Sequence, residues 1–141
     1  MKWLAITASV LVSAGCSDLV IERYATIGDA RNAGLFEGGW LPDVLPSSTR
    51  DIEARNNLDF NVSAGEFVLS PSDLDSFAAR LRPYSAEPAD GNVHLVSYLH
   101  AKEKAGLRVG VLEEAPSIWA FACDPKTGRC TYQLVSKQEA R

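Results

Sequence analysis

The sequence has few of the residues that build most catalytic and metal sites. Its 141 residues include three cysteines and two histidines. None of the motifs of P-loop, dinucleotide-binding, zinc-protease or serine-hydrolase sites occurs in it. Positive charge is also scarce, because 14 lysines and arginines face 18 aspartates and glutamates, for a net charge of −4. Since nucleic-acid-binding proteins usually carry a basic patch, this balance argues against that class.

The chain also lacks internal repeats, low-complexity tracts and an apolar run long enough to cross a membrane. The uncharged stretch at residues 3–14 would rise about 18 Å as a helix, whereas a bilayer core is about 30 Å thick. Apolar residues make up 46% of the chain. That fraction is typical of a globular protein and too high for a disordered one. We expect residues 19–141 to form a single folded domain.

The N-terminal residues have the pattern of a secretory signal. Lys2 precedes the apolar stretch of residues 3–14, and the tetrapeptide S-A-G-C ends at Cys16. This tetrapeptide resembles a bacterial lipobox, in which the cysteine thiol receives a diacylglycerol and the signal is cut before the cysteine. The resemblance implies that residues 1–15 are removed, that Cys16 is lipidated and that residues 16–18 form a short tether. An ordinary signal peptide with a chance cysteine, or a buried N-terminal helix, is the alternative.

The residue after the lipidated cysteine bears on localisation. In lipoproteins of this class an aspartate there retains many proteins in the inner membrane, so Ser17 favours the outer membrane, although Asp18 follows. The resemblance thus implies an outer-membrane, lipid-anchored protein of a Gram-negative bacterium, with its domain in the periplasm. Removing residues 1–15 deletes Lys2 and no acid, which leaves a net charge of 13 − 18 = −5. We therefore expect the acyl chains, rather than electrostatic docking on anionic lipid, to hold the protein.

The other two cysteines, Cys123 and Cys130, flank the turn-forming sequence DPKTGR. Pairing them across an antiparallel hairpin puts the large apolar residues of both strands on one face, because side chains alternate along a strand. The facing pairs would be Phe121 with Tyr132 and Trp119 with Leu134. We predict a structural disulfide at this hairpin. A metal site would need more ligands, and the spacing is not that of a redox C-x-x-C motif.

Local patterns predict strands on both sides of an amphipathic helix. Ser70 is a good N-cap and Pro71 suits the first helical position, and apolar residues recur at helical spacing up to residue 82. A short helical turn is expected in residues 29–34. Strands are expected at residues 19–27, 51–61, 66–69, 93–101, 107–112, 117–123 and 129–136. This order predicts an α+β fold with a single antiparallel-rich sheet, one main helix packed on one face and a C-terminal disulfide-stapled hairpin.

Residues 51–61 alternate between polar and apolar side chains, apart from Asn56 in the apolar row. This alternation predicts a half-buried strand, and a helix that begins with the S-x-x-D sequence at residues 48–51 is the alternative. The polar row contains Asp51, Glu53, Arg55, Asn57, Asp59 and Asn61. Its acidic members could contact a cation or a partner, but a solvated strand face is the simpler interpretation.

His94 and His100 would lie about 20 Å apart on one strand, too far to bind one metal. We therefore expect no metal site and no cofactor.

The segment of residues 34–46 is the best candidate for partner binding. Its glycines and prolines forbid a long regular element, yet it is too apolar for a free loop. We expect an ordered loop pinned by Trp40. Because tryptophan is enriched at binding hot spots, Trp40, Leu41, Pro42 and Asp43 are the candidate partner-binding residues. The alternative is that the loop plugs the domain's own core.

Part of the mature sequence resembles an uncharacterised family of small exported bacterial proteins. The resemblance is carried by GWLPDVLPSS at residues 39–48, D-I at residues 51–52 and NLDFN at residues 57–61. These match that family's G-W-[LI]-P-x-x-L-P-x-S, D-I and N-L-D-x-N. The resemblance implies no activity, cofactor or catalytic residue. It implies that Trp40 and its neighbouring prolines form one structural unit with the strand at residues 51–61.

These observations favour a non-enzymatic outer-membrane lipoprotein whose periplasmic domain binds another envelope protein, without nucleic acid. Two alternatives stay open. One is an immunity or inhibitor lipoprotein that neutralises a toxin or hydrolase, since an acidic domain suits a basic active-site cleft. The other is a hydrolase whose site is assembled from residues distant in sequence.

Overall fold

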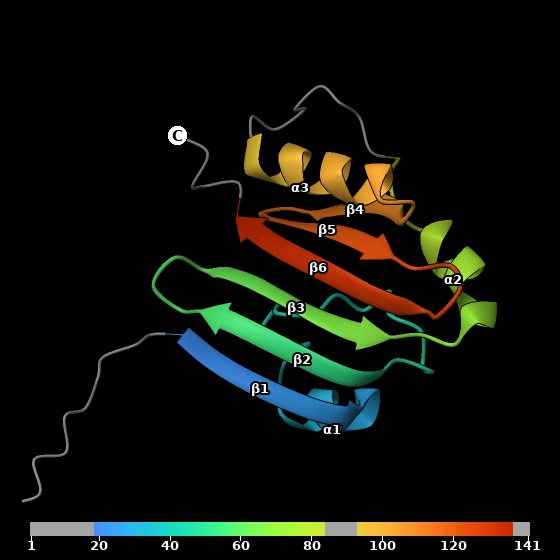
Figure 1. Ribbon diagram of the computed structural model, residues 1–141. Coiled ribbons are helices and arrows are strands. Elements are labelled where there is room, and N and C mark those ends of the chain that lie inside the picture. The colour runs from blue at the N-terminus through green and yellow to red at the C-terminus, as the bar shows by residue number, and fades with distance from the viewer. Residues whose placement is uncertain (1–18, 84–92, 137–141) are drawn as a thin grey trace, which may run out of the picture.

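The computed structural model describes residues 19–83 and 93–136. The expected signal peptide, the lipidation site Cys16 and the tether lie outside these residues. The elements are β1 (Leu19–Thr26), α1 (Ile27–Asn32), β2 (Arg50–Asn57), β3 (Val62–Val68), α2 (Pro71–Ala78), α3 (Val93–Lys104), β4 (Arg108–Glu114), β5 (Ser117–Cys123) and β6 (Arg129–Ser136). In the described part, the strands form one six-stranded sheet in the order β1-β2-β3-β6-β5-β4 (Figure 1). All neighbouring strands are antiparallel, which confirms the predicted α+β class.

The C-terminal hairpin has the predicted register. Cys123 lies opposite Cys130 and the two form a disulfide. The predicted facing pairs, Phe121 with Tyr132 and Trp119 with Leu134, are also present. Both cysteines are buried. The disulfide therefore closes the hairpin at the edge of the core and not on the surface.

The main core lies on one face of the sheet, here called the covered face. Its centre is a cluster of four aromatic rings from β3, α2, β5 and β6. Phe77 packs edge-on against Phe121 with ring centroids 5.2 Å apart, and Phe67 and Tyr132 complete the cluster. Residues of α1, of the loop between α1 and β2, and of α2 pack over these rings. This burial is the principal hydrophobic stabilisation of the domain.

The two helices on the covered face begin and end for local reasons. Thr26 and Asp29 form a capping box that starts α1 at Ile27, two residues before the expected helical turn. Gly34, with φ of +84°, follows the end of this helix. Ser70 occupies the predicted N-cap position of α2 in an extended conformation, but its hydroxyl contacts that of Ser72 and caps no backbone N–H. The helix ends at Ala78, earlier than the expected residue 82.

The prediction of a strand at residues 93–101 is wrong, because Val93–Lys104 is the helix α3. Leu95, Tyr98 and Leu99 fall at helical spacing and pack against Ile118 and other apolar residues of the sheet face opposite the covered face. The hydroxyl groups of Tyr98 and Thr131 are 2.6 Å apart. The sheet thus carries helices on both faces, with the predicted helix α2 on the covered face and α3 on the other.

The strand predicted at residues 51–61 is present but shorter, since β2 ends at Asn57. Its buried row includes Asn56, which accepts a hydrogen bond of 2.6 Å from the Ser63 hydroxyl. That bond explains how a polar side chain is tolerated there. The expected inward residues Leu58 and Phe60 lie instead in the turn to β3, and their side chains are 56% and 61% exposed. Among the described helices, no segment is both long and apolar enough to cross a membrane.

Candidate functional site

The sheet face opposite the covered face is only partly protected. The helix α3 packs over β4 and β5, with Tyr98 reaching β6. Over β1, β2 and β3 the side chains remain exposed or half-buried. Five charged residues of this surface alternate along their strands with side chains that point to the covered face. We call the surface that these five residues form the open face. The five residues are Arg23, Glu53, Arg55, Glu66 and Arg129.

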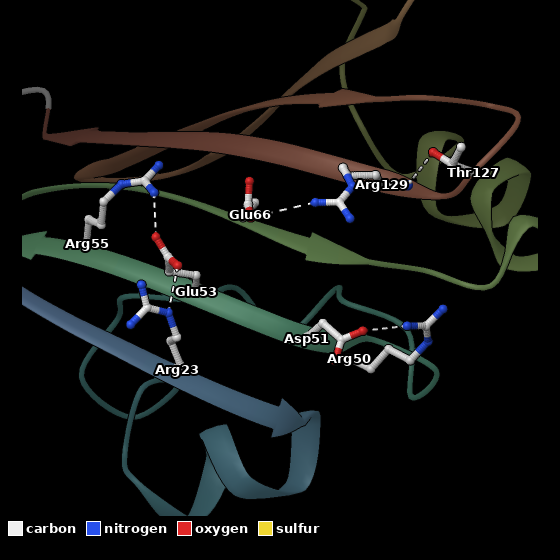
Figure 2. A network of polar contacts seen from close by, with 8 residues as sticks. All are labelled: Arg23, Arg50, Asp51, Glu53, Arg55, Glu66, Thr127 and Arg129. Carbon is white, nitrogen blue, oxygen red and sulfur yellow. Dashed lines mark hydrogen bonds and ion pairs between the residues drawn. The ribbon is translucent and has the colours of Figure 1, made fainter.

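The charges of the open face are paired within β2 and across neighbouring strands (Figure 2). Arg23 of β1 donates from Nε to Glu53 Oε2 at 2.9 Å. Arg55 donates from Nη1 to Glu53 Oε1 at 2.6 Å. Each oxygen of the Glu53 carboxylate is therefore held by a different guanidinium group. Arg129 Nη1 and Glu66 Oε1 form a looser ion pair, 3.7 Å apart.

The Glu53 carboxylate is kept ionised by these contacts. The hydrogen bond from Arg55 is the largest influence on the pKa of Glu53 and lowers it. Burial, the next largest, raises this pKa, and the hydrogen bond and charge of Arg23 lower it again. At neutral pH the carboxylate is a fixed negative charge and not a proton donor. Its role in the geometry is to orient the two arginines on the strand surface.

One end of the open face is irregular. The register between β2 and β3 shifts between Arg50 and Glu53, and Asp51 there has φ of +50°. Asp51 forms an ion pair with Arg50. Beside this bulge lies a hollow of about 300 Å³. Its lining includes Arg23, Tyr24, Asp51, Glu53 and Glu66. The hollow has room for a side chain of a partner, and its walls offer charges of both signs.

The structure separates the residues of the predicted polar row. Asp51 and Glu53 lie at the open face, whereas Asp59 and Asn61 lie in the turn between β2 and β3. Arginines, moreover, stand among the acids of the open face. Within residues 19–83 and 93–136, no group of three or more His, Cys, Asp or Glu side chains is arranged to hold a metal ion.

The predicted partner-binding loop contributes mainly to the core. Leu41 is 2% exposed and Pro42 is buried, while Trp40 is half-buried against the main core. Asp43 is exposed and pairs with Arg31 at 3.3 Å. A role of this loop in recognition stays a prediction; of its four candidate residues, Asp43 is exposed and Trp40 is half-buried.

The two histidines lie on a helix and not on the expected strand. Both His94 and His100 are exposed on α3. Six positions along a helix turn the side chains to different sides, so they do not share a face as the strand prediction required.

Three members of the open face were not singled out from the sequence, namely Arg23, Glu66 and Arg129. The register places Arg23 directly opposite Glu53, and Glu53 opposite Glu66. A search for opposite charges on facing strands would have found the first pair, but only once the register was known.

Part of the chain is similar to a bacterial domain family. Residues 18–68 match the family model of the YbbD head domain. The matched segment contains β1, α1, β2 and β3, and therefore four of the five residues of the open face. No curated protein and no solved structure matches the chain.

Proposed function

We propose that this protein is a lipid-anchored envelope protein without enzymatic activity, whose domain binds another envelope protein through the open face. The observation that carries the binding role is the array of paired charges that β1, β2, β3 and β6 leave uncovered. The anchor is proposed from the S-A-G-C sequence that ends at Cys16. Three acyl chains would exceed what stable membrane attachment requires.

The chemistry of the open face suits a protein partner. Arginine is enriched at protein interfaces because its planar group makes several hydrogen bonds at once. The side chain of Arg23 is 73% exposed and that of Arg129 is 63% exposed, so both can reach a partner. Alternating charges also give specificity, since a partner must present the complementary pattern.

The edge of the sheet adds a second means of recognition. β1 is an edge strand, and most of its residues are exposed. An edge strand presents backbone N–H and C=O groups to which another chain can add a strand. Because Arg23 belongs to β1, a partner at this edge would meet the open face at the same time.

The charge pattern favours this function over a blocker of basic active-site clefts. Although the chain is acidic overall, arginines account for three of the five open-face residues. A basic cleft would be repelled by these arginines. A partner of mixed charge would not.

The test is site-specific crosslinking in intact cells. A photo-crosslinking amino acid replaces Ala64, which lies on β3 opposite Arg55. A matched control places it at the exposed Ala101 of α3. We expect a discrete crosslinked product from position 64 and none from position 101. Charge reversal by Arg55→Glu should reduce the product about tenfold or more, while Arg80→Glu at an exposed position just after α2 should not.

Protein purified from the same cells is used to measure the mass of the intact chain. A mass that shows loss of residues 1–15 and an acylated Cys16 supports the anchor, and an unmodified full-length mass overturns it. Equal crosslinking from positions 64 and 101, or no effect of Arg55→Glu, would overturn binding at the open face.

A further inference from the structure

The large apolar side chains that stand exposed in the described residues gather at one corner of the sheet. They are Leu19, Val20 and Ile21 of β1 and Leu58 and Phe60 of the β2–β3 turn, and we call them the apolar corner. Their exposed fractions run from 38% for Val20 to 61% for Phe60. The register joins the two segments, because Leu19 lies directly opposite Asn57, the residue before Leu58. Figure 1 shows the start of β1 beside the turn that connects β2 to β3.

The turn displays its apolar side chains through fixed backbone geometry. Asn57 Oδ1 accepts hydrogen bonds from the backbone N–H groups of Asp59 and Phe60, at 3.1 and 3.2 Å. Asn61, with φ of +49°, then returns the chain to β3. Polar side chains therefore build the turn, and Leu58 and Phe60 are left to face outward. On β1, Leu19 and Ile21 lie on the side of the sheet that carries Arg55, and Val20 lies on the other side, so apolar side chains are exposed on both sides of this corner. Exposed apolar surface gathered in one place is costly in water and marks a contact site.

The chain entering β1 indicates what covers this corner. Cys16 precedes Leu19 by three residues, and three residues span at most about 10 Å. This argument rests on the proposed lipidation of Cys16. A lipid attached there would hold the start of β1 within that distance of the bilayer surface. The apolar corner would then be the part of the domain nearest to the membrane.

We infer that the apolar corner is a membrane-contact surface, in which Leu58 and Phe60 enter the interfacial region of the bilayer beside the lipid anchor. Side chains of this kind bind the boundary between headgroups and acyl chains. The contact is apolar and not electrostatic, since the mature domain would carry a charge of −5. The contact would also set the orientation of the domain on the membrane. The acidic end of β4, with Glu113 and Glu114, lies at the same end of the strands, three strand spacings (~14 Å) from β3 and five (~24 Å) from β1. The domain would therefore tilt that end away from the membrane.

The experiment measures the depth of a tryptophan in the bilayer. Mature, membrane-extracted protein carrying Phe60→Trp is reconstituted into vesicles of phosphatidylethanolamine and phosphatidylglycerol with brominated acyl chains, which quench nearby tryptophan. The matched control is Lys126→Trp, in the exposed turn at the opposite end of the sheet. Wild-type protein supplies the background of Trp40 and Trp119. Leu58→Trp repeats the measurement from the other side of the turn, should Phe60→Trp fold poorly.

We expect the added tryptophan at position 60 to be quenched about twofold or more beyond that at position 126, and raised salt to leave the difference unchanged. Equal quenching at positions 60 and 126 in protein that floats with the vesicles would overturn the membrane contact and leave the anchor standing. Protein that does not float, with an unacylated mass, would overturn the anchor and the contact that depends on it. Mass and flotation therefore separate the two failures.

Discussion

Removal of the disulfide between Cys123 and Cys130 should destabilise the domain by an amount that depends on the length of the loop that the disulfide closes. The two cysteines are seven positions apart in sequence. In the chain-entropy model, a loop of this length loses about 8 cal/mol/K in the unfolded state when it is closed, or about 2.5 kcal/mol at 25 °C. Because the neighbouring hydrogen bonds of β5 and β6 keep the same register without the bond, we expect the fold to survive.

The perturbation is the double variant Cys123→Ala, Cys130→Ala. Alanine avoids placing hydroxyl groups at positions that are 2% and 0% exposed. Urea unfolding followed by circular dichroism gives the free energy of unfolding of the variant and of the wild type. We expect the variant to be less stable by about 2–4 kcal/mol, since loss of the two buried sulfurs adds a small cavity cost to the entropic effect.

A reductant provides the internal control. It should lower the stability of the wild type towards that of the double variant and leave the variant unchanged. A wild-type advantage below about 1 kcal/mol would refute the reasoning, because it would mean that the unfolded chain gains little freedom when the bond is absent. A change in the variant on adding reductant would show that the effect does not arise from this disulfide.

Two further predictions concern the open face and α3. The pKa of Glu53 is lowered in the folded state, so its ionised form stabilises the fold. This contribution is fully present at pH values above 4.5, the ordinary pKa of the group, and it disappears as the pH falls through the lowered pKa. The stability difference between wild type and Glu53→Gln in urea should therefore be largest near neutral pH and vanish in acid; a difference that grows in acid would contradict the ion-pair assignment. Leu99→Ala, at a position 2% exposed, should cost about 2–5 kcal/mol in the free energy of unfolding. Glu103→Ala, exposed on the same helix, should change it by less than about 0.5 kcal/mol, and equal effects of the two variants would contradict the packing of α3 on the sheet.

Short-range patterns determined those parts of the fold in which the interacting residues are close in sequence. The C-terminal hairpin was predictable with its register, because a seven-position separation between the cysteines leaves one pairing that also buries the aromatic row. The start of α2 at Pro71 and the inward row of β2 were predictable for the same reason. Capping residues and alternation act within a few positions of the chain.

Tertiary structure decided what the sequence left ambiguous. Leu95, Tyr98 and Leu99 suit one face of a helix, but residues 93–101 alone did not distinguish a helix from a strand. The apolar surface of Ile118 and Ala120, on a distant strand, selects the helix because it buries that face. The turn residues Leu58 and Phe60 continue the alternation of β2 yet stay exposed, since the Asn57 side chain ends the strand before them.

The open face shows the same division most clearly. Its charges come from segments as far apart as Arg23 and Arg129, and nothing within either segment marks them as partners of Glu53 or Glu66. The sequence by itself determined that a polar row would line one side of β2. Arg55 stands beside Glu53 in that same row. Only the pairing of β1 with β2 and of β3 with β6 decided that Arg23 and Arg129 would meet Glu53 and Glu66, because the order and register of strands depend on burying the opposite face of the whole sheet.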